Sequence, residues 1–231
     1  MSVLITNFEK GKFNKIWRDM ADLGYRIREP EYFDEAIIIL EQTMKKVKRN
    51  IIIIRERLLE LGFIFEEKYP ESMPIFRDPA DNVSIVLDEI ESLVGVIPLS
   101  LRYFYTIVGT VNFMGYHPNW PNYYSDPLVV HSPDIALEWW KWNYANEPEN
   151  STEIIVAPDQ FHKAGHSGTG TYTMKVPNLS FDGILEGESH NVSFIHYLQM
   201  CFKWGGFPGF EQIGLAPLED IKTLARDLLP I

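Results

Sequence analysis

The feature that most constrains the fold is a regular series of apolar residues in the N-terminal third of the chain. Neighbouring members are alternately three and four positions apart, and the series comprises Ile37, Leu40, Met44, Val47, Ile51, Ile54, Leu58 and Leu61. This spacing places every member on one side of an α-helix. The pattern predicts one long helix from about Glu31 to Leu61, ended by Gly62, with a length of about 45 Å at a rise of about 1.5 Å per residue.

Further apolar residues widen this stripe beyond a two-stranded seam, among them Ile38, Ile39, Ile52 and Ile53. A wide stripe favours packing against other elements of the same fold, and a homodimer through the helix is the alternative. The other side of the helix is basic, with Lys45, Lys46, Lys48, Arg49, Arg55 and Arg57. Charge runs of this kind usually face solvent, so we expect a solvated face.

Composition indicates a globular protein with an acidic surface. The 231 residues are 45% hydrophobic and 13% aromatic, which is enough for a sizeable core. A net charge of −11 argues against binding to nucleic acid or to anionic membrane, because both require a positive surface. Acidity favours a basic protein partner, although many acidic proteins are simply soluble.

Cys201 is the only cysteine, so the chain has no internal disulfide and no cysteine zinc cage. The N-terminus has neither the basic start nor the apolar stretch of a signal peptide. The longest aliphatic runs, Ile37–Leu40 and Ile51–Ile54, are far too short to cross a membrane. These features predict a soluble, cytoplasmic protein.

Two blocks in the rest of the chain mark where helices begin or end. Pro98 suits the first position of a helix, and the aromatic turn that follows it stops at Gly109. The second block, Trp204 to Gly209, contains two glycines that can end a helix and a proline that cannot continue one.

The remaining pattern alternates short strands with helices. Helices are expected over 8–23 and 82–94, after Ser132-Pro133, after a cap at Asn191, and from Pro217; strands are expected over 110–116, 127–130, 153–156, 171–176 and 181–186. The sequence predicts an α+β fold, with a mainly antiparallel sheet flanked by helices and an N-terminal helical extension. We expect a single domain over 1–231, mainly helical in 1–94 and mixed in 95–231.

The segment from Ala157 to Gly170 contains the residue types of a hydrolase, and Asp159, His162, Lys163 and Ser167 make it a candidate ligand loop. A nucleophile elbow is absent, because Thr169 stands where its second glycine would be. His162 and His166 are four residues apart, but glycines interrupt the helix that would align them, and no third ligand is near. We expect no metal site, no cofactor and no catalytic residues.

Aromatic residues are concentrated between Phe113 and Tyr144, interleaved with carboxylates and amides. Aromatic anchors beside carboxylates are typical of protein-binding hot spots, and an ordinary core is the alternative. Trp139 and Trp140 point about 100° apart on a helix, so at least one should lie near the surface. The predicted partner-binding residues are Trp120, Tyr123, Tyr124, Asp126, Glu138 and Trp140.

The order of these motifs resembles the SUKH superfamily, which groups yeast cell-wall-assembly regulators with bacterial immunity proteins. The resemblance covers roughly residues 95–229 and is carried by 97–105, 108–113, 126–130, 157–172 and 194–209. It implies an α+β fold that binds other proteins without catalysis. Many similar bacterial proteins bind polymorphic toxins, often nucleases, and an acidic protein suits a basic nuclease electrostatically.

The first functional hypothesis is therefore an immunity-type protein that blocks a cognate, basic toxin domain. The second is a regulatory or housekeeping interaction module, as the cell-wall-regulator resemblance suggests. The third is a small-ligand-binding protein or an enzyme that uses the 157–172 loop.

Overall fold

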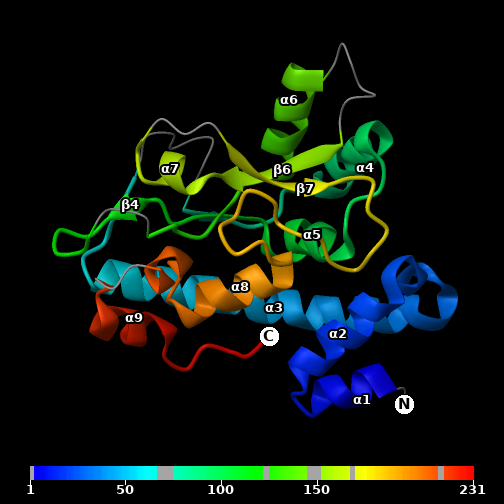
Figure 1. Cartoon of the computed structure of the whole chain (residues 1–231), viewed down its shortest axis with the longest axis horizontal. Helices are drawn as coiled ribbons and strands as arrows, with labels where there is room; N and C mark the ends of the chain where they lie inside the picture. Colours follow the sequence, from blue (N-terminus) through cyan, green and yellow to red (C-terminus); the bar gives the residue numbers. More distant parts are fainter. Residues whose placement is uncertain (1–2, 67–74, 122–124, 145–151, 167–169, 213–215) are drawn as a thin grey trace.

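The computed structural model describes residues 3–66, 75–121, 125–144, 152–166, 170–212 and 216–231. The fold is α+β, as predicted, and helix outweighs strand by 55% to 12%. One hydrophobic core includes residues from Phe8 near the N-terminus to Ile231 at the C-terminus. Figure 1 shows the long helix α3 running beneath the strands, with α8 and α9 beside it and α6 projecting on the opposite side.

The helices follow the predicted order with small shifts at their ends, apart from a short helix at Gln160–Lys163, where the sequence predicts a loop. They are α1 (Val3–Glu9), α2 (Phe13–Leu23), α3 (Pro30–Glu60), α4 (Val83–Val94), α5 (Leu99–Tyr103), α6 (Pro133–Tyr144), α7 (Gln160–Lys163), α8 (Phe194–Lys203) and α9 (Leu218–Ala225). Short 3₁₀ turns occur at η1 (Gly24–Arg28) and η4 (Pro208–Glu211), and α5 continues into a π-helical turn, η2 (Phe104–Val108). The helix expected over 8–23 is two helices, because Gly11 takes a positive φ of 69° between them.

Helix α3 confirms the long helix within one residue at each end. Six of the eight residues in the predicted series, from Leu40 to Leu58, have no exposed surface, whereas Ile37 and Leu61 at its ends are half-buried. The covering elements belong to the same chain, chiefly α1, α5, α9, η1 and η2. Burial of apolar area at about 25 cal/mol per Å² therefore fixes α3 within its own fold. The homodimer stays a prediction.

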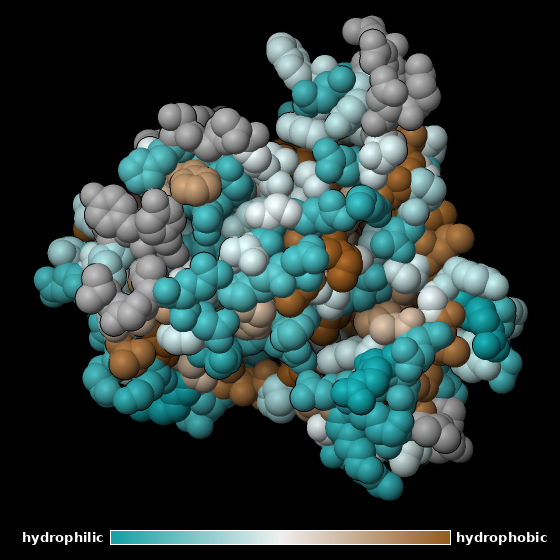
Figure 2. Space-filling model, in the orientation of Figure 1, coloured by the Kyte–Doolittle hydropathy of each residue, from teal (hydrophilic) through white to brown (hydrophobic). Residues whose placement is uncertain are grey.

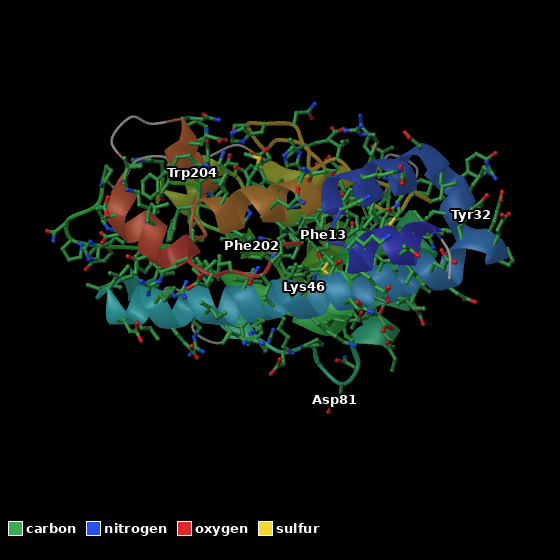
Figure 3. All side chains as sticks on the ribbon, turned by 90° about the horizontal axis from the view of Figure 1, so that it is seen from below. Phe13, Tyr32, Lys46, Asp81, Phe202 and Trp204 are labelled. Carbon is green, nitrogen blue, oxygen red and sulfur yellow. The ribbon has the colours of Figure 1, made fainter. Side chains whose placement is uncertain are left out.

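The basic side of α3 is only partly a solvated face, and the prediction is wrong for two of its residues. Lys46 Nζ lies 4.3 Å from the centre of the Phe13 ring and also donates to the Pro230 carbonyl. Figure 3 shows Lys46 on α3 beneath Phe13 of α2. Arg57 donates to the carbonyls of Leu224 and Arg226. These cations fasten both ends of the chain to α3, whereas Lys45 is exposed as expected.

In the part of the chain that the structure describes, the strands form three small antiparallel sheets. β1 (Ile64–Phe65) pairs with β4 (Gly115–Tyr116); β2 (Phe76–Arg77), β3 (Thr110–Asn112) and β5 (Val129–Val130) form a second sheet; and β6 (Glu153–Pro158) pairs with β7 (Thr171–Lys175). A register irregularity between Ile155 and Ala157 bends the last pair. Every pairing is antiparallel, as predicted.

The strand expected over 181–186 is reduced to isolated bridges at Glu186 and Ile184. Carbonyl groups of this segment instead accept hydrogen bonds from the first turns of two helices. The Ser100 N–H of α5 donates to the Phe181 carbonyl, and the Phe194 N–H of α8 donates to the Gly183 carbonyl. The carboxylate of half-buried Asp182 accepts from the Ser100 hydroxyl and from the Ile195 N–H. Burial raises the pKa of Asp182, against the opposing effect of these hydrogen bonds.

The predicted cap at Asn191 is wrong. Asn191 has a positive φ of 51° and precedes α8, which begins at Phe194. Asp182 satisfies the first turn of α8 from a distant part of the chain, which local sequence spacing cannot reveal.

Both punctuation blocks behave as predicted. α5 begins directly after Pro98, and Gly109 ends the following π turn with a φ of 96°. After α8, Gly205 and Gly206 have φ values of 61° and 97°; a Cβ on Gly206 would stand 2.9 Å from the Phe113 ring. Only glycine can adopt a positive φ without strain and also leave room for the Phe113 ring. The turn leads the chain into η4.

Candidate functional site

A pocket of about 260 Å³ opens where three of the singled-out segments meet. The segments are the aromatic stretch after Phe113, the 157–172 loop and the turn after Trp204. The lining residues come from β4, from α7 and its end, and from the segment that follows α8, elements that can be located in Figure 1. Its lining comprises Phe63, Glu66, Gly115, Tyr116, His117, Trp120, Pro121, Ser125, Lys163, Ala164, Gly165, Phe207 and Phe210.

The floor of this pocket is a cluster of packed aromatic rings, which we call the aromatic floor: Phe63, Trp120, Phe207 and Phe210. The Trp120 ring meets Phe207 and Phe210 edge-on, with centroids 5.3 and 6.0 Å apart, and Phe63 lies 5.5 Å from Phe207. Edge-to-face pairs of this kind are favoured by more than the area that they bury.

Trp120, one of the predicted partner-binding residues, does not lie on the open surface. Its side chain is 7% exposed, and its indole N–H donates to Asp220 Oδ2 at 2.7 Å. A carboxylate from α9 thus fixes a tryptophan that is 100 residues away in the sequence. Trp120 belongs to the aromatic floor of the pocket, not to a flat docking face.

His117 lies against the Trp120 ring, with centroids 5.0 Å apart, and both of its ring nitrogens are engaged. Nε2 lies 3.0 Å from the Leu61 carbonyl, and Nδ1 accepts from the Asn119 N–H at 3.3 Å. This arrangement fits the neutral tautomer with the proton on Nε2. A histidine bound on both sides is poorly placed to transfer protons in the pocket.

Behind the pocket lies a buried ion pair. Lys163 is 4% exposed, and its ammonium lies 2.6 Å from Asp126 Oδ1 and 3.4 Å from the Tyr197 hydroxyl. The ammonium also lies 4.3 Å from the centre of the Tyr172 ring. Asp126 is buried with a φ of 47°, a conformation that Asp tolerates better than most residues. We call Lys163, Asp126, Tyr172 and Tyr197 the buried ion-pair cluster.

Burial and the charges of this cluster shift the pKa of Tyr172, which belongs to it, and of His131. Burial, and secondarily the Asp126 charge, raises the pKa of the Tyr172 phenol. Burial, reinforced by the Lys163 charge, lowers the pKa of His131 to about 4. His131 Nδ1 is also buried without a hydrogen-bond partner among the described atoms. His131 is consequently neutral at physiological pH.

The predicted partner residue Asp126 and the predicted ligand-loop residue Lys163 therefore bind each other. Neither is available to a macromolecule at the surface. A buried charge without a partner costs so much free energy that Asp126 and Lys163 each require the other. This requirement explains why an aspartate and a lysine occupy these two positions.

Asp159 and His162 come together, as the loop prediction required, but as a helix cap. Asp159 Oδ1 accepts from the His162 N–H and lies 2.9 Å from His162 Nδ1, while Oδ2 accepts from the Gly170 N–H. Burial opposes the charged form of Asp159, but these hydrogen bonds prevail and lower its pKa. Through these hydrogen bonds, Asp159 joins the start of α7 to Gly170 at the other end of the loop. Ser167, the remaining predicted member, lies outside the described residues.

The remaining predicted partner-binding residues differ in their exposure. Trp140 is buried with Ala136 and Leu137, so it is core and not an anchor. Glu138 is exposed, as predicted. Trp139 is half-buried, which agrees with the expected divergence of the two tryptophans. Tyr123 and Tyr124 lie outside the described residues.

The structure adds one residue that the sequence analysis missed. Trp142 is 89% exposed, the largest exposed fraction of any described large hydrophobic side chain. It lies one turn after Glu138 and two turns after Asp134, opposite the buried side of the helix. We call Asp134, Glu138 and Trp142 the α6 stripe. A helical-wheel reading of 133–144, with Trp140 facing inward, could have found it.

The chain matches no known family model, no curated protein and no solved structure. The SUKH resemblance therefore remains a prediction based on the motifs. No group of three or more His, Cys, Asp or Glu in the described part of the chain is arranged to hold a metal ion. Among the described helices, none combines the length and the apolar character needed to cross a membrane.

Proposed function

We propose that this protein is a non-catalytic binding protein of the immunity type, which neutralises a basic partner protein by docking on it through the α6 stripe. The observation that carries the proposal is Trp142, an 89% exposed tryptophan on a helix that projects from the molecule. Exposed tryptophans are costly in water and are enriched among residues that dominate binding energy.

The chemistry around Trp142 favours a basic partner. Asp134 and Glu138 precede it at intervals of one turn, so one side of the helix carries two carboxylates and an aromatic ring. Lys141, the neighbouring cation, lies 2.6 Å from Glu89 of α4 and is neutralised by it. Figure 2 shows that the face around the projecting helix is largely hydrophilic. With a net charge of −11, such a surface attracts positively charged proteins.

The test is binding to a candidate partner, such as a basic toxin domain encoded beside this protein, measured by biolayer interferometry. We expect a Kd below micromolar, and about a 30-fold loss for Trp142→Ala, the size typical of a hot-spot residue. Glu138→Lys should slow association and reduce its dependence on salt. Tyr25→Ala is the matched control, since Tyr25 is 70% exposed on a different part of the surface.

Two outcomes separate the competing functions. Neutralisation predicts that co-expression restores growth of cells that produce the toxin domain, whereas a regulatory module would bind a partner without that rescue. An enzyme using the 157–172 loop would lose its activity in His162→Ala and keep it in Trp142→Ala. Wild-type affinity of both α6 variants for every basic partner would refute the proposed docking surface.

A further inference from the structure

A second, smaller cavity lies where η2, β3 and the start of α6 meet, and it shares no lining residue with the pocket over the aromatic floor. Its volume is about 20 Å³, and its lining includes Tyr105, Thr110 and Ser132. We propose that this space, which we call the hydroxyl cavity, binds one water molecule that bridges the hydroxyl groups of Tyr105 and Thr110. The site is independent of the proposed docking on a partner protein.

Two hydroxyl groups of the lining are buried without a hydrogen-bond partner among the described residues. Tyr105 has no exposed surface and Thr110 is 7% exposed, and neither Tyr105 Oη nor Thr110 Oγ1 is paired. Burial raises the pKa of the Tyr105 phenol, so this group keeps its proton. Each hydroxyl can therefore both donate and accept a hydrogen bond, as a water molecule can. Burial of an unpaired hydroxyl costs free energy, and a bridging water would remove that cost at both residues.

The size of the hydroxyl cavity fits this ligand. A single water molecule needs at least about 10–15 Å³ of cavity, whereas pockets for organic ligands usually span about 300–1,000 Å³. The 20 Å³ at Tyr105 and Thr110 is therefore suited to one water molecule and is too small for an organic ligand. Buried waters make about three hydrogen bonds on average. The buried Ser132, directly before α6, supplies a third hydroxyl to the lining.

The charges around the hydroxyl cavity favour a neutral ligand over an ion. Arg77 and Asp134 both line the cavity and carry opposite charges. Asp78 also belongs to the lining, but its carboxylate lies 2.5 Å from the ammonium of Lys48. The charges therefore cancel, and the lining offers no net attraction to an anion or to a cation.

The first test is the stability of Tyr105→Phe and Thr110→Val, which remove one hydroxyl each and nearly keep the shape of the side chain. If a water pairs with each hydroxyl, each variant loses a hydrogen bond, and its unfolding equilibrium constant should rise about fivefold. If the hydroxyls have no partner, each variant removes a cost of burial, and the constant should fall instead. The direction of the change therefore decides between a hydrated and a dry cavity.

The double variant tests whether one water serves both residues. Because loss of either hydroxyl already weakens a shared water, Tyr105→Phe/Thr110→Val should raise the unfolding constant by less than the product of the single effects, about 25-fold. Denaturant unfolding provides all three values. Tyr25→Phe is the matched control, since Tyr25 is 70% exposed and its variant should stay within about twofold of the wild type.

A high-resolution crystal structure of the protein provides the direct test. We expect one water oxygen at about 2.5–3.0 Å from both Tyr105 Oη and Thr110 Oγ1, and no such water in the double variant. Crystals soaked in bromide or in rubidium identify an ion at this position by its anomalous scattering.

Four results would overturn the inference: a dry cavity, a water that contacts only one of the two hydroxyls, bromide or rubidium in its place, or unfolding constants that fall in both single variants. None of these measurements involves Trp142 or a partner protein. Failure of the water site and failure of the proposed function therefore remain distinguishable.

Discussion

The apolar side of α3 and the buried ion-pair cluster lie in one core but are built from opposite chemistry. Along α3, residues such as Ile51 and Ile54 are wholly buried and contact other apolar groups. In the cluster, Lys163 and Asp126 are equally inaccessible, yet both are ionic and lie 37 residues apart in the sequence. The first region derives its stability from area removed from water, the second from pairing that compensates for lost hydration.

The difference teaches where this fold tolerates change. Loss of one methyl group from an apolar helix costs about 0.5–1.5 kcal/mol, and the neighbours partly relax. Loss of one member of a buried ion pair leaves the other as an isolated charge, which no relaxation of the core can satisfy. The aromatic pocket adjoins the second region, so its walls are supported by the less tolerant part of the core.

The largest expected effect is that of Lys163→Met. This change keeps the length of the side chain but leaves the Asp126 carboxylate buried without its cation, and it should reduce the free energy of unfolding by about 3–5 kcal/mol. Denaturant unfolding monitored by tryptophan fluorescence measures the loss. The double variant Lys163→Met/Asp126→Asn, which contains neither charge, should recover part of it.

Lys203→Met is the matched control for this comparison. Lys203 lies 2.8 Å from Glu211, but its side chain is 65% exposed. Solvent screens such a pair, so its loss should cost less than about 1 kcal/mol. Equal losses for Lys163→Met and Lys203→Met would contradict the view that burial gives the first pair its importance.

The second prediction concerns pH and His131, beside the same cluster. Its pKa is about 4 in the folded protein, against 6.5 for the ordinary group, because burial and the Lys163 charge disfavour the protonated form. Between these two values the unfolded chain binds a proton that the folded chain excludes. Stability should therefore be complete above about pH 6.5 and fall by about 3 kcal/mol as the pH decreases to about 4.

The variant His131→Phe, which carries no titratable group at this position, separates this effect from the titration of carboxylates. Between pH 7 and pH 4, the free energy of unfolding of this variant should fall by about 3 kcal/mol less than that of the wild type. Parallel pH profiles for the two proteins would show that His131 is not the titrating group.

The two regions also differ in how far the sequence predicts them. The α3 helix follows from spacing alone, because a helix places residues three and four apart on one side whatever lies elsewhere. The glycine stops at Gly109 and Gly206 follow from backbone conformation, which is equally local. The strand expected over 181–186 failed because the starts of α5 and α8 use its backbone groups, and that competition is not local.

The candidate site was predictable only in part, for the same reason. Residue type selects Trp120, Asp126 and Lys163 from the sequence, and all three lie at or beside the pocket. Trp120 and Asp126 were predicted to bind a partner and Lys163 to belong to a ligand loop, because nothing in the spacing shows that Asp126 meets Lys163 or that Asp220 meets Trp120. Residue chemistry located the region, and only tertiary contacts assigned the roles.

The smallest effect tests whether α3 is as uniformly apolar as its spacing suggests. Asn50 lies within the series, between Val47 and Ile51, and is wholly buried. Its amide nitrogen donates to the Leu229 carbonyl and its amide oxygen accepts from the Leu229 N–H, both at 2.8 Å. It therefore pairs with the C-terminal segment as a strand would. Asn50→Ala leaves both Leu229 groups without their partner and should reduce the free energy of unfolding by about 2 kcal/mol.

Lys46→Met is the control for Asn50→Ala, since Lys46 is only half-buried and its hydrogen bond to the neighbouring Pro230 carbonyl is exposed to solvent. Water can replace that hydrogen bond, so its loss together with the cation–π contacts should cost less than about 1 kcal/mol. Hydrogen exchange at the Leu229 amide provides a local measurement and should accelerate more in Asn50→Ala than in Lys46→Met. The opposite order would mean that the apolar contacts of α3 hold the C-terminal segment without Asn50. The buried side of α3 would then depend on apolar contacts alone, in contrast to the ion-pair cluster, which depends on paired charges.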